Sequence, residues 1–214
     1  MPKSIEWLPE NILKEDVEAS RRMYDFIERD FDTCIEYVAL DSNHFNVYSP
    51  RIANIILRIC PEILRIFDLI LFNQKITTSF EEQPELRMQI VKIHKKKKIR
   101  KDWFIDYLKA LPELTTKSVK AKTLEEKIKP FEIIKIKLHH KKEPIESVDW
   151  WEWGYNALRH RIVREFKESA TLKHALFSLA GLYVLHDRLD RDWGRMDVFR
   201  SRIFRSEILP YISL

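Results

Sequence analysis

Apolar residues near the start of the chain recur at steps of three and four residues, which is the spacing of one face of an α-helix. The positions between them are mostly polar or charged. The apolar positions are Leu13, Val17, Met23, Tyr24, Phe26, Ile27, Phe31, Ile35 and Val38. This pattern predicts a long amphipathic helix over residues 11–40.

A short polar segment separates this helix from a second one. Residues 41–47 (DSNHFNV) are rich in turn-forming side chains, and Ser49 followed by Pro50 is typical of an N-cap with proline at the first helical position. The second apolar pattern extends to Ile70, and Pro61 inside it is expected to kink the helix. Two long helices with a short connection predict an antiparallel helical pair.

The middle of the chain changes its periodicity. Residues 102–110 (DWFIDYLKA) predict a short helix that is capped by Asp102. Residues 118–122 and 131–138 instead alternate roughly every second position and contain many β-branched side chains, which is typical of strands. We therefore expect a small β-hairpin insertion over residues 115–145.

Helical periodicity returns in the last third of the chain. The predicted helices cover residues 149–168, 171–187 and roughly 195–206. The middle one contains the small residues Ala175, Ala180 and Gly181, which permit close approach of a neighbouring helix. Taken together, the patterns predict a mainly α, up-and-down helical bundle of about four to five long helices, formed by one domain over residues 1–214.

The composition restricts the function classes. The chain of 214 residues has only 3 glycines and 2 cysteines, Cys34 and Cys60. So few glycines exclude phosphate-binding loops of the Walker and Rossmann types, and neither cysteine has the spacing of a metal site. We therefore expect no metal and no cofactor. We also interpret His174 and His186, beside the apolar helix, as structural histidines.

Neither the N-terminal residues nor the longest apolar stretch suggests a membrane. The N-terminal residues are too polar for a secretory signal, and the longest apolar stretch, residues 175–185, is too short to span a bilayer. Two free thiols suit a reducing compartment. These observations predict a cytoplasmic protein.

The net charge of +5, with a pI near 9.1, permits a polyanionic partner without requiring one. A basic run precedes Trp103 and contains Lys95, Lys96, Lys97, Lys98, Arg100 and Lys101. This run is a candidate nucleic-acid contact, with the tryptophan stacking on a base. The alternative interpretation is a solvated loop or helix face.

Residues 149–161 (DWWEWGYNALRHR) combine aromatic and polar side chains most densely. On a helix with about 100° per residue, the apolar side chains share one stripe: Trp151, Tyr155, Leu158, Ile162 and Phe166. The other side carries Trp153, Asn156, His160, Arg164 and Lys167. Asn156 and His160 are four residues apart and so lie on one helical face, where they need water, a partner or a substrate.

This polar face combines groups that suit RNA cleavage without a metal. Histidine titrates near neutral pH, which makes His160 the candidate general acid and base. The amide of Asn156 is a candidate to orient a ribose hydroxyl or the imidazole itself. Arg159, Arg161 and Arg164 are candidates for binding phosphate oxygens. The alternative is a basic, solvated helix face with one incidental histidine.

The same segment, with the Ala- and Leu-rich helix after it, resembles the closing helices of a HEPN-like family of prokaryotic helical proteins. The family carries a WW..YN..KH.R pattern, on which fall Trp150, Trp151, Tyr155, Asn156, Arg159 in place of lysine, His160 and Phe166. Upstream, the resemblance includes Asn43 or Asn46, Tyr48-Ser49, Cys60-Pro61-Glu62 and Lys129-Pro130-Phe131. It therefore covers most of the chain.

The resemblance implies an RNA-directed protein. Active members are helical bundles with an R-x(4–6)-H motif, and they form homodimers in which two motifs share one cleft. Carried over, Asn156 is the polar residue after the arginine and His160 is the histidine. Tyr155 stands where the family has the arginine, and it is one of the candidate substrate-binding residues. Ile162 stands where the family has a second arginine, two residues after the histidine.

Two functions follow from the resemblance. The chain is expected to be a metal-independent endoribonuclease in stress response or phage defence, active as a homodimer and paired with an antitoxin-like protein. The alternative is a non-catalytic RNA- or protein-binding bundle that has lost the ribonuclease motif. Tyr155 in the place of the arginine favours this alternative.

Overall fold

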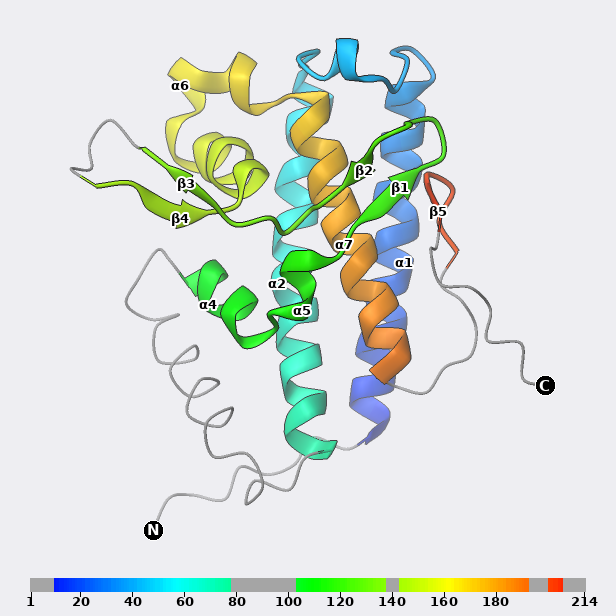
Figure 1. Cartoon of the computed structure of the whole chain (residues 1–214). Coiled ribbons are helices and arrows are strands. Elements are labelled where there is room, and N and C mark those ends of the chain that lie inside the picture. The colour runs from blue at the N-terminus through cyan, green and yellow to red at the C-terminus, as the bar shows by residue number, and fades with distance from the viewer. Residues whose placement is uncertain (1–9, 78–102, 138–142, 193–199, 206–214) are drawn as a thin grey trace.

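Three long helices form the frame of the protein, which the computed structural model describes over residues 10–77, 103–137, 143–192 and 200–205. They are α1 (Glu10–Ile35), α2 (Pro50–Thr77) and α7 (Leu172–Asp192). Figure 1 shows the three side by side, with the connection between α1 and α2 at the top. The described structure is mainly helical, as the apolar periodicity predicts.

The connection between α1 and α2 uses local caps. Ser49 Oγ accepts a hydrogen bond from the backbone N–H of Ile52 at 3.1 Å, which confirms the predicted cap ahead of Pro50. The first helix ends at Ile35, five residues before the predicted end, and a 3-10 turn, η1 (Ser42–His44), follows. Asp41 caps this turn, because its carboxylate accepts from Asn43 N at 2.8 Å.

Two small antiparallel sheets lie beside the helices. The strands are β1 (Val119–Ala121), β2 (Lys127–Ile128), β3 (Ile134–Ile136), β4 (Ile145–Ser147) and β5 (Phe204–Arg205). β1 pairs with β2 and with β5, and β3 pairs with β4. The prediction of a helix over 195–206 is therefore wrong for Phe204 and Arg205. These residues pair with Lys120 and Ala121 as an edge strand.

Shorter helices cover one side of the frame. They are α4 (Trp103–Ala110), α5 (Glu113–Thr116), the π-helix η2 (Trp150–Asn156) and α6 (Ala157–Ser169). The predicted single helix over 149–168 is thus two elements with different hydrogen bonding. A π-helix closes its hydrogen bonds five residues apart rather than four, which rotates its side chains away from α-helical positions.

The double tryptophan builds the aromatic part of the core. The rings of Trp151 and Phe104 stack with 4.0 Å between centroids, and Trp150 meets Phe104 edge-on at 5.6 Å. Trp150 Nε1 also donates to the carbonyl of Pro130 at 2.5 Å. Gly181 on α7 makes room here, because a Cβ at this position would lie 3.1 Å from Cζ of the Phe131 ring. Its small size therefore admits an aromatic ring rather than a neighbouring helix.

A buried polar network joins the three long helices. Ser20 Oγ donates to Glu62 Oε1 at 2.5 Å, and Arg65 binds the same carboxylate at 2.7 Å. His186 Nε2 lies 3.5 Å from Ser20 Oγ and is fully buried. The arrangement of a serine, a histidine and a glutamate is structural, because Ser20 is also fully buried and out of reach of a substrate.

Glu28 fixes the segment that leads into β5. This carboxylate is almost fully buried, and it accepts hydrogen bonds from the hydroxyl of Tyr24 at 3.0 Å and from Arg202 N at 3.0 Å. The Ser201 hydroxyl binds it as well. A buried carboxylate with several donors anchors a segment that is distant in sequence.

Candidate functional site

The first turn of α6 carries the predicted arginine and histidine. Arg159 and His160 are both exposed, whereas Ala157 and Leu158 just before them are buried. The positive charge of Arg159 acts on the hydroxyl of Tyr155 and favours a lower pKa for it. The arginine therefore lies near the position where the HEPN-like pattern has its own arginine.

The amide of Asn156 has a hydrogen-bond partner within its own helix. Its amide Nδ2 donates to Glu152 Oε2 at 3.1 Å, one turn earlier in the π-helix, and Glu152 is itself buried. The amide is thus held by a carboxylate of its own element. His160 lies on the exposed α-helical turn that follows.

Tyr155 packs mainly as a core residue. Its side chain is only 7% exposed, and its ring centroid lies 4.9 Å from that of Trp151. Burial raises the pKa of its hydroxyl, and the neighbouring Arg159 acts in the opposite direction. The hydroxyl, rather than the ring, is therefore the part of Tyr155 that reaches the polar face.

Several predicted site residues lie outside the described part of the molecule. They are the basic run Lys95, Lys96, Lys97, Lys98, Arg100 and Lys101, and the side chains of Arg161, Ile162 and Arg164. Their roles stay predictions from the sequence.

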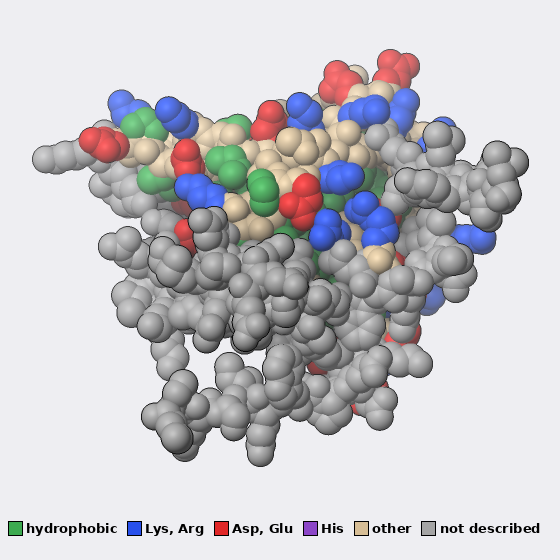
Figure 2. All heavy atoms as spheres, turned by 60° about the horizontal axis from the view of Figure 1, so that its bottom comes forward, with side chains coloured by type: hydrophobic (Ala, Val, Ile, Leu, Met, Phe, Trp, Pro, Cys, Tyr) green, Lys and Arg blue, Asp and Glu red, His purple; other side chains and the backbone are tan. Residues whose placement is uncertain are grey.

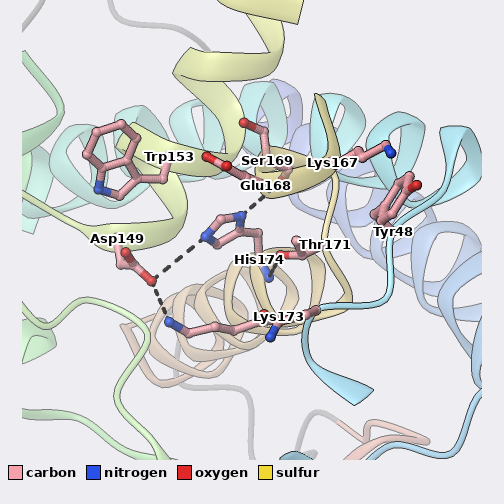
Figure 3. Close-up of a pocket in the computed structure, with 10 residues that line it drawn as sticks. Tyr48, Asp149, Trp153, Lys167, Glu168, Ser169, Thr171, Lys173 and His174 are labelled. Atoms are coloured by element: carbon pink, nitrogen blue, oxygen red, sulfur yellow. Dashed lines mark hydrogen bonds and ion pairs between the residues drawn. The ribbon is translucent and has the colours of Figure 1, made fainter. Parts of the chain in front are cut away.

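A pocket of about 400 Å³ opens beside the π-helix (Figure 3). It is lined by Asn46, Tyr48, Asp149, Trp153, Lys167, Glu168, Ser169, Thr171, Lys173 and His174. The sequence placed Trp153 and Lys167 on the polar side of one helix but did not indicate a pocket. No periodic signal was available to find it, because the lining comes from segments more than 100 residues apart.

Backbone hydrogen bonds hold these distant segments together. The N–H of Leu172 donates to Val47 O at 2.8 Å, and the N–H of Lys173 donates to Phe45 O at 3.1 Å. Tyr48 and Thr171 form an antiparallel bridge between them. The connection before α2 is therefore fixed against the junction of α6 and α7, and this contact forms one wall of the pocket.

His174 lies in the centre of the lining and is almost fully buried (Figure 3). Its Nδ1 donates to the carbonyl of Ser169 at 3.0 Å, because a carbonyl oxygen only accepts. Burial lowers the pKa of His174, while the Ser169 hydrogen bond and Asp149 act in the opposite direction. The other ring nitrogen, Nε2, lies 3.8 Å from Asp149 Oδ2.

Gly154 provides the space for this imidazole. A Cβ at position 154 would lie 3.1 Å from Cβ and 3.2 Å from Cγ of His174, closer than side chains normally pack. The glycine of the WWEWG segment therefore brings the π-helix against α7 at the pocket. This close approach is a packing reason for one of the few glycines in the chain.

The charges around the pocket balance. Lys173 Nζ binds Asp149 Oδ2 at 2.8 Å, and Lys167 Nζ lies 5.7 Å from the centre of the Tyr48 ring. Glu168 supplies the second carboxylate. Two lysines face two carboxylates, so the pocket carries no formal excess of either sign.

The surface elsewhere is also mixed in charge. Figure 2 shows acidic and basic side chains interspersed over the described part of the face that it presents. Within the described ranges, no group of three or more His, Cys, Asp or Glu side chains is arranged to hold a metal ion. None of the described helices combines the length and the apolar character that a membrane span needs.

No family model matches the chain, and no curated protein or solved structure matches it either.

Proposed function

We propose that this protein is a HEPN-like, RNA-directed helical protein that binds single-stranded RNA at the start of α6. The observation that supports this most is the exposure of Arg159 and His160 on a turn whose preceding residues are buried. Arginine binds phosphate oxygens in a bidentate manner, and imidazole both donates and accepts hydrogen bonds near neutral pH.

The global charge supports a polyanionic partner. The net charge is +5, and the basic run over Lys95–Lys98 is a second predicted contact with the RNA backbone. The homodimer, the antitoxin-like partner and a role in stress response or defence rest on the family resemblance. In the proposed dimer, two copies of the α6 turn face the same RNA.

Substitution of Arg159 tests the proposal. Arg159→Ala is expected to weaken binding of a fluorescent single-stranded RNA, measured by anisotropy over a series of salt concentrations. Each lost phosphate contact lowers the slope of log affinity against log salt by about 0.7. Arg22→Ala, which removes another exposed arginine on α1, is the matched control and is expected to leave the slope unchanged. Equal effects of the two substitutions would contradict binding at α6.

Cleavage of the bound RNA is the second candidate activity. It is favoured by the exposure of His160, because a general base must reach the 2′-hydroxyl. Incubation of RNA with the wild type and with His160→Ala separates the two activities. Products formed by the wild type alone indicate a ribonuclease, and binding without products by either protein indicates a binding module.

A further inference from the structure

We infer that the pocket between Tyr48, Trp153 and His174 holds one unstacked RNA base. The inference rests on the proposed RNA function and adds to it a place where a base is recognised. Single-stranded RNA is commonly recognised in this way, by bases that leave the stack and pack on aromatic side chains.

The size and the walls of the pocket fit a base. Its volume of about 400 Å³ lies within the range of small-ligand pockets. Trp153 from the π-helix and Tyr48 from the connection before α2 lie on opposite sides of His174 (Figure 3). Trp153 is half-buried and Tyr48 is 42% exposed. Aromatic side chains in such positions stack with bases of any sequence.

The charges argue against a pocket that recognises phosphate. Lys173 is already paired with Asp149, and Lys167 lies over the Tyr48 ring. Glu168 balances the second lysine. A neutral group with several hydrogen-bonding edges fits such a lining better than an anion does.

The lining offers both hydrogen-bond acceptors and donors. The carboxylates of Asp149 and Glu168 accept only, whereas the ammonium groups of Lys167 and Lys173 donate only. A base presents donors and acceptors along its edges, so such a lining fits a base better than a purely apolar group.

The pocket also lies close to the proposed backbone contact. Arg159 lies in the first turn of α6, and Lys167 and Glu168 lie in its last turn. A rise of about 1.5 Å per residue separates Arg159 from Lys167 by roughly 12 Å along the helix. One RNA strand bound at the start of α6 therefore has a neighbouring nucleotide within reach of the pocket.

Binding of mononucleotides to the full chain tests the inference directly. Titration calorimetry is expected to show tighter binding of cytidine 5′-monophosphate and uridine 5′-monophosphate than of ribose 5-phosphate, which lacks a base. Stacking of the base on aromatic side chains is expected to make this difference at least about five-fold. Equal affinity for ribose 5-phosphate and for the two nucleotides would overturn the inference.

Variants separate stacking from hydrogen bonding. Trp153→Ala is expected to weaken binding of the cytidine nucleotide at least about five-fold. The control Tyr37→Ala removes an aromatic side chain that is 82% exposed and is expected to leave the affinity unchanged. Glu168→Gln removes a carboxylate acceptor from the lining and is expected to weaken binding of the cytidine nucleotide, with the exposed Glu126→Gln as its control. Glu168 is exposed, so its replacement keeps the inference testable even if Trp153→Ala fails to fold.

A cytidine-containing RNA oligomer identifies the source of the base. Weaker oligomer binding by Trp153→Ala supports a base of RNA in the pocket. Oligomer binding that Trp153→Ala leaves unchanged overturns the inference and leaves the proposed RNA function standing. Selective mononucleotide binding without oligomer binding overturns the RNA function and assigns the pocket to a free nucleotide.

Discussion

Replacement of Trp150 by alanine is expected to lower the free energy of unfolding by about 3–5 kcal/mol, the range for a large aromatic side chain deleted from a core. The side chain is only 1% exposed. Its ring packs against Phe104 and Phe131, and its indole N–H donates to the Pro130 carbonyl. The substitution leaves a cavity and also removes the donor for a buried carbonyl.

Urea unfolding of three variants measures this effect. Trp150→Phe keeps most of the ring volume but loses the N–H donor, so it is expected to fall between the wild type and Trp150→Ala. Trp153→Ala is the matched control, because Trp153 is half-buried at the pocket. A loss for Trp150→Ala no larger than that for Trp153→Ala would show that the double tryptophan does not anchor the core.

Acid is expected to destabilise the fold through His186. Burial, together with the nearby cations Arg21 and Arg65, lowers the pKa of His186 to about 3. An unfolded histidine has a pKa near 6.5, so the unfolded state binds the proton that the folded state excludes. The free energy of unfolding therefore falls as pH drops below about 6.5, by up to about 1.4 kcal/mol per pH unit until the folded pKa is reached.

The variant His186→Gln isolates this contribution. Urea unfolding of both proteins at about pH 7, 6 and 5 gives two slopes of the free energy of unfolding against pH, in the range where histidine titrates. The wild-type slope is expected to be steeper by up to about 1.4 kcal/mol per unit. The carboxylates affect both proteins alike and cancel in the difference. Parallel slopes would show that His186 is not held neutral in the folded protein.

The long helices could be predicted from the sequence because their buried apolar residues recur with a simple period. The apolar residues of α1 and α2 recur at helical spacing over many turns, and Ser49 with Pro50 marks a helix start by local chemistry. The helix prediction also placed Trp151, Tyr155 and Leu158 on the buried stripe, and all three are buried. Local patterns predict such elements because both the cap and the apolar face lie within one segment.

The π-helix and the pocket could not be predicted from the sequence in this way. Seven residues with π-helical hydrogen bonds have no period of their own that distinguishes them from an α-helix. An α-helical spacing therefore predicts Trp153 and Asn156 on one polar face. In the structure, Trp153 and Asp149 line the pocket, whereas Asn156 binds Glu152. Contacts such as Leu172 N to Val47 O join segments that no local pattern relates.

The edge strand β5 illustrates the same limit. Residues 204–205 carry an apolar side chain that also fits a helical pattern, and the sequence favoured a helix there. The structure holds this segment by the buried Glu28 and by pairing with β1. Tertiary contacts of this kind override the local preference of a short segment.

RNA binding at the start of α6 is tested most directly by locating the bound RNA on the protein. Addition of a single-stranded RNA of mixed sequence to the isotope-labelled full chain is expected to shift the backbone amide resonances of Arg159 and His160 most. Smaller shifts are expected at the pocket, for example at Lys173. The absence of shifts on addition of RNA, or shifts confined to the exposed α1 surface around Met23 and Phe26, would contradict the proposed function.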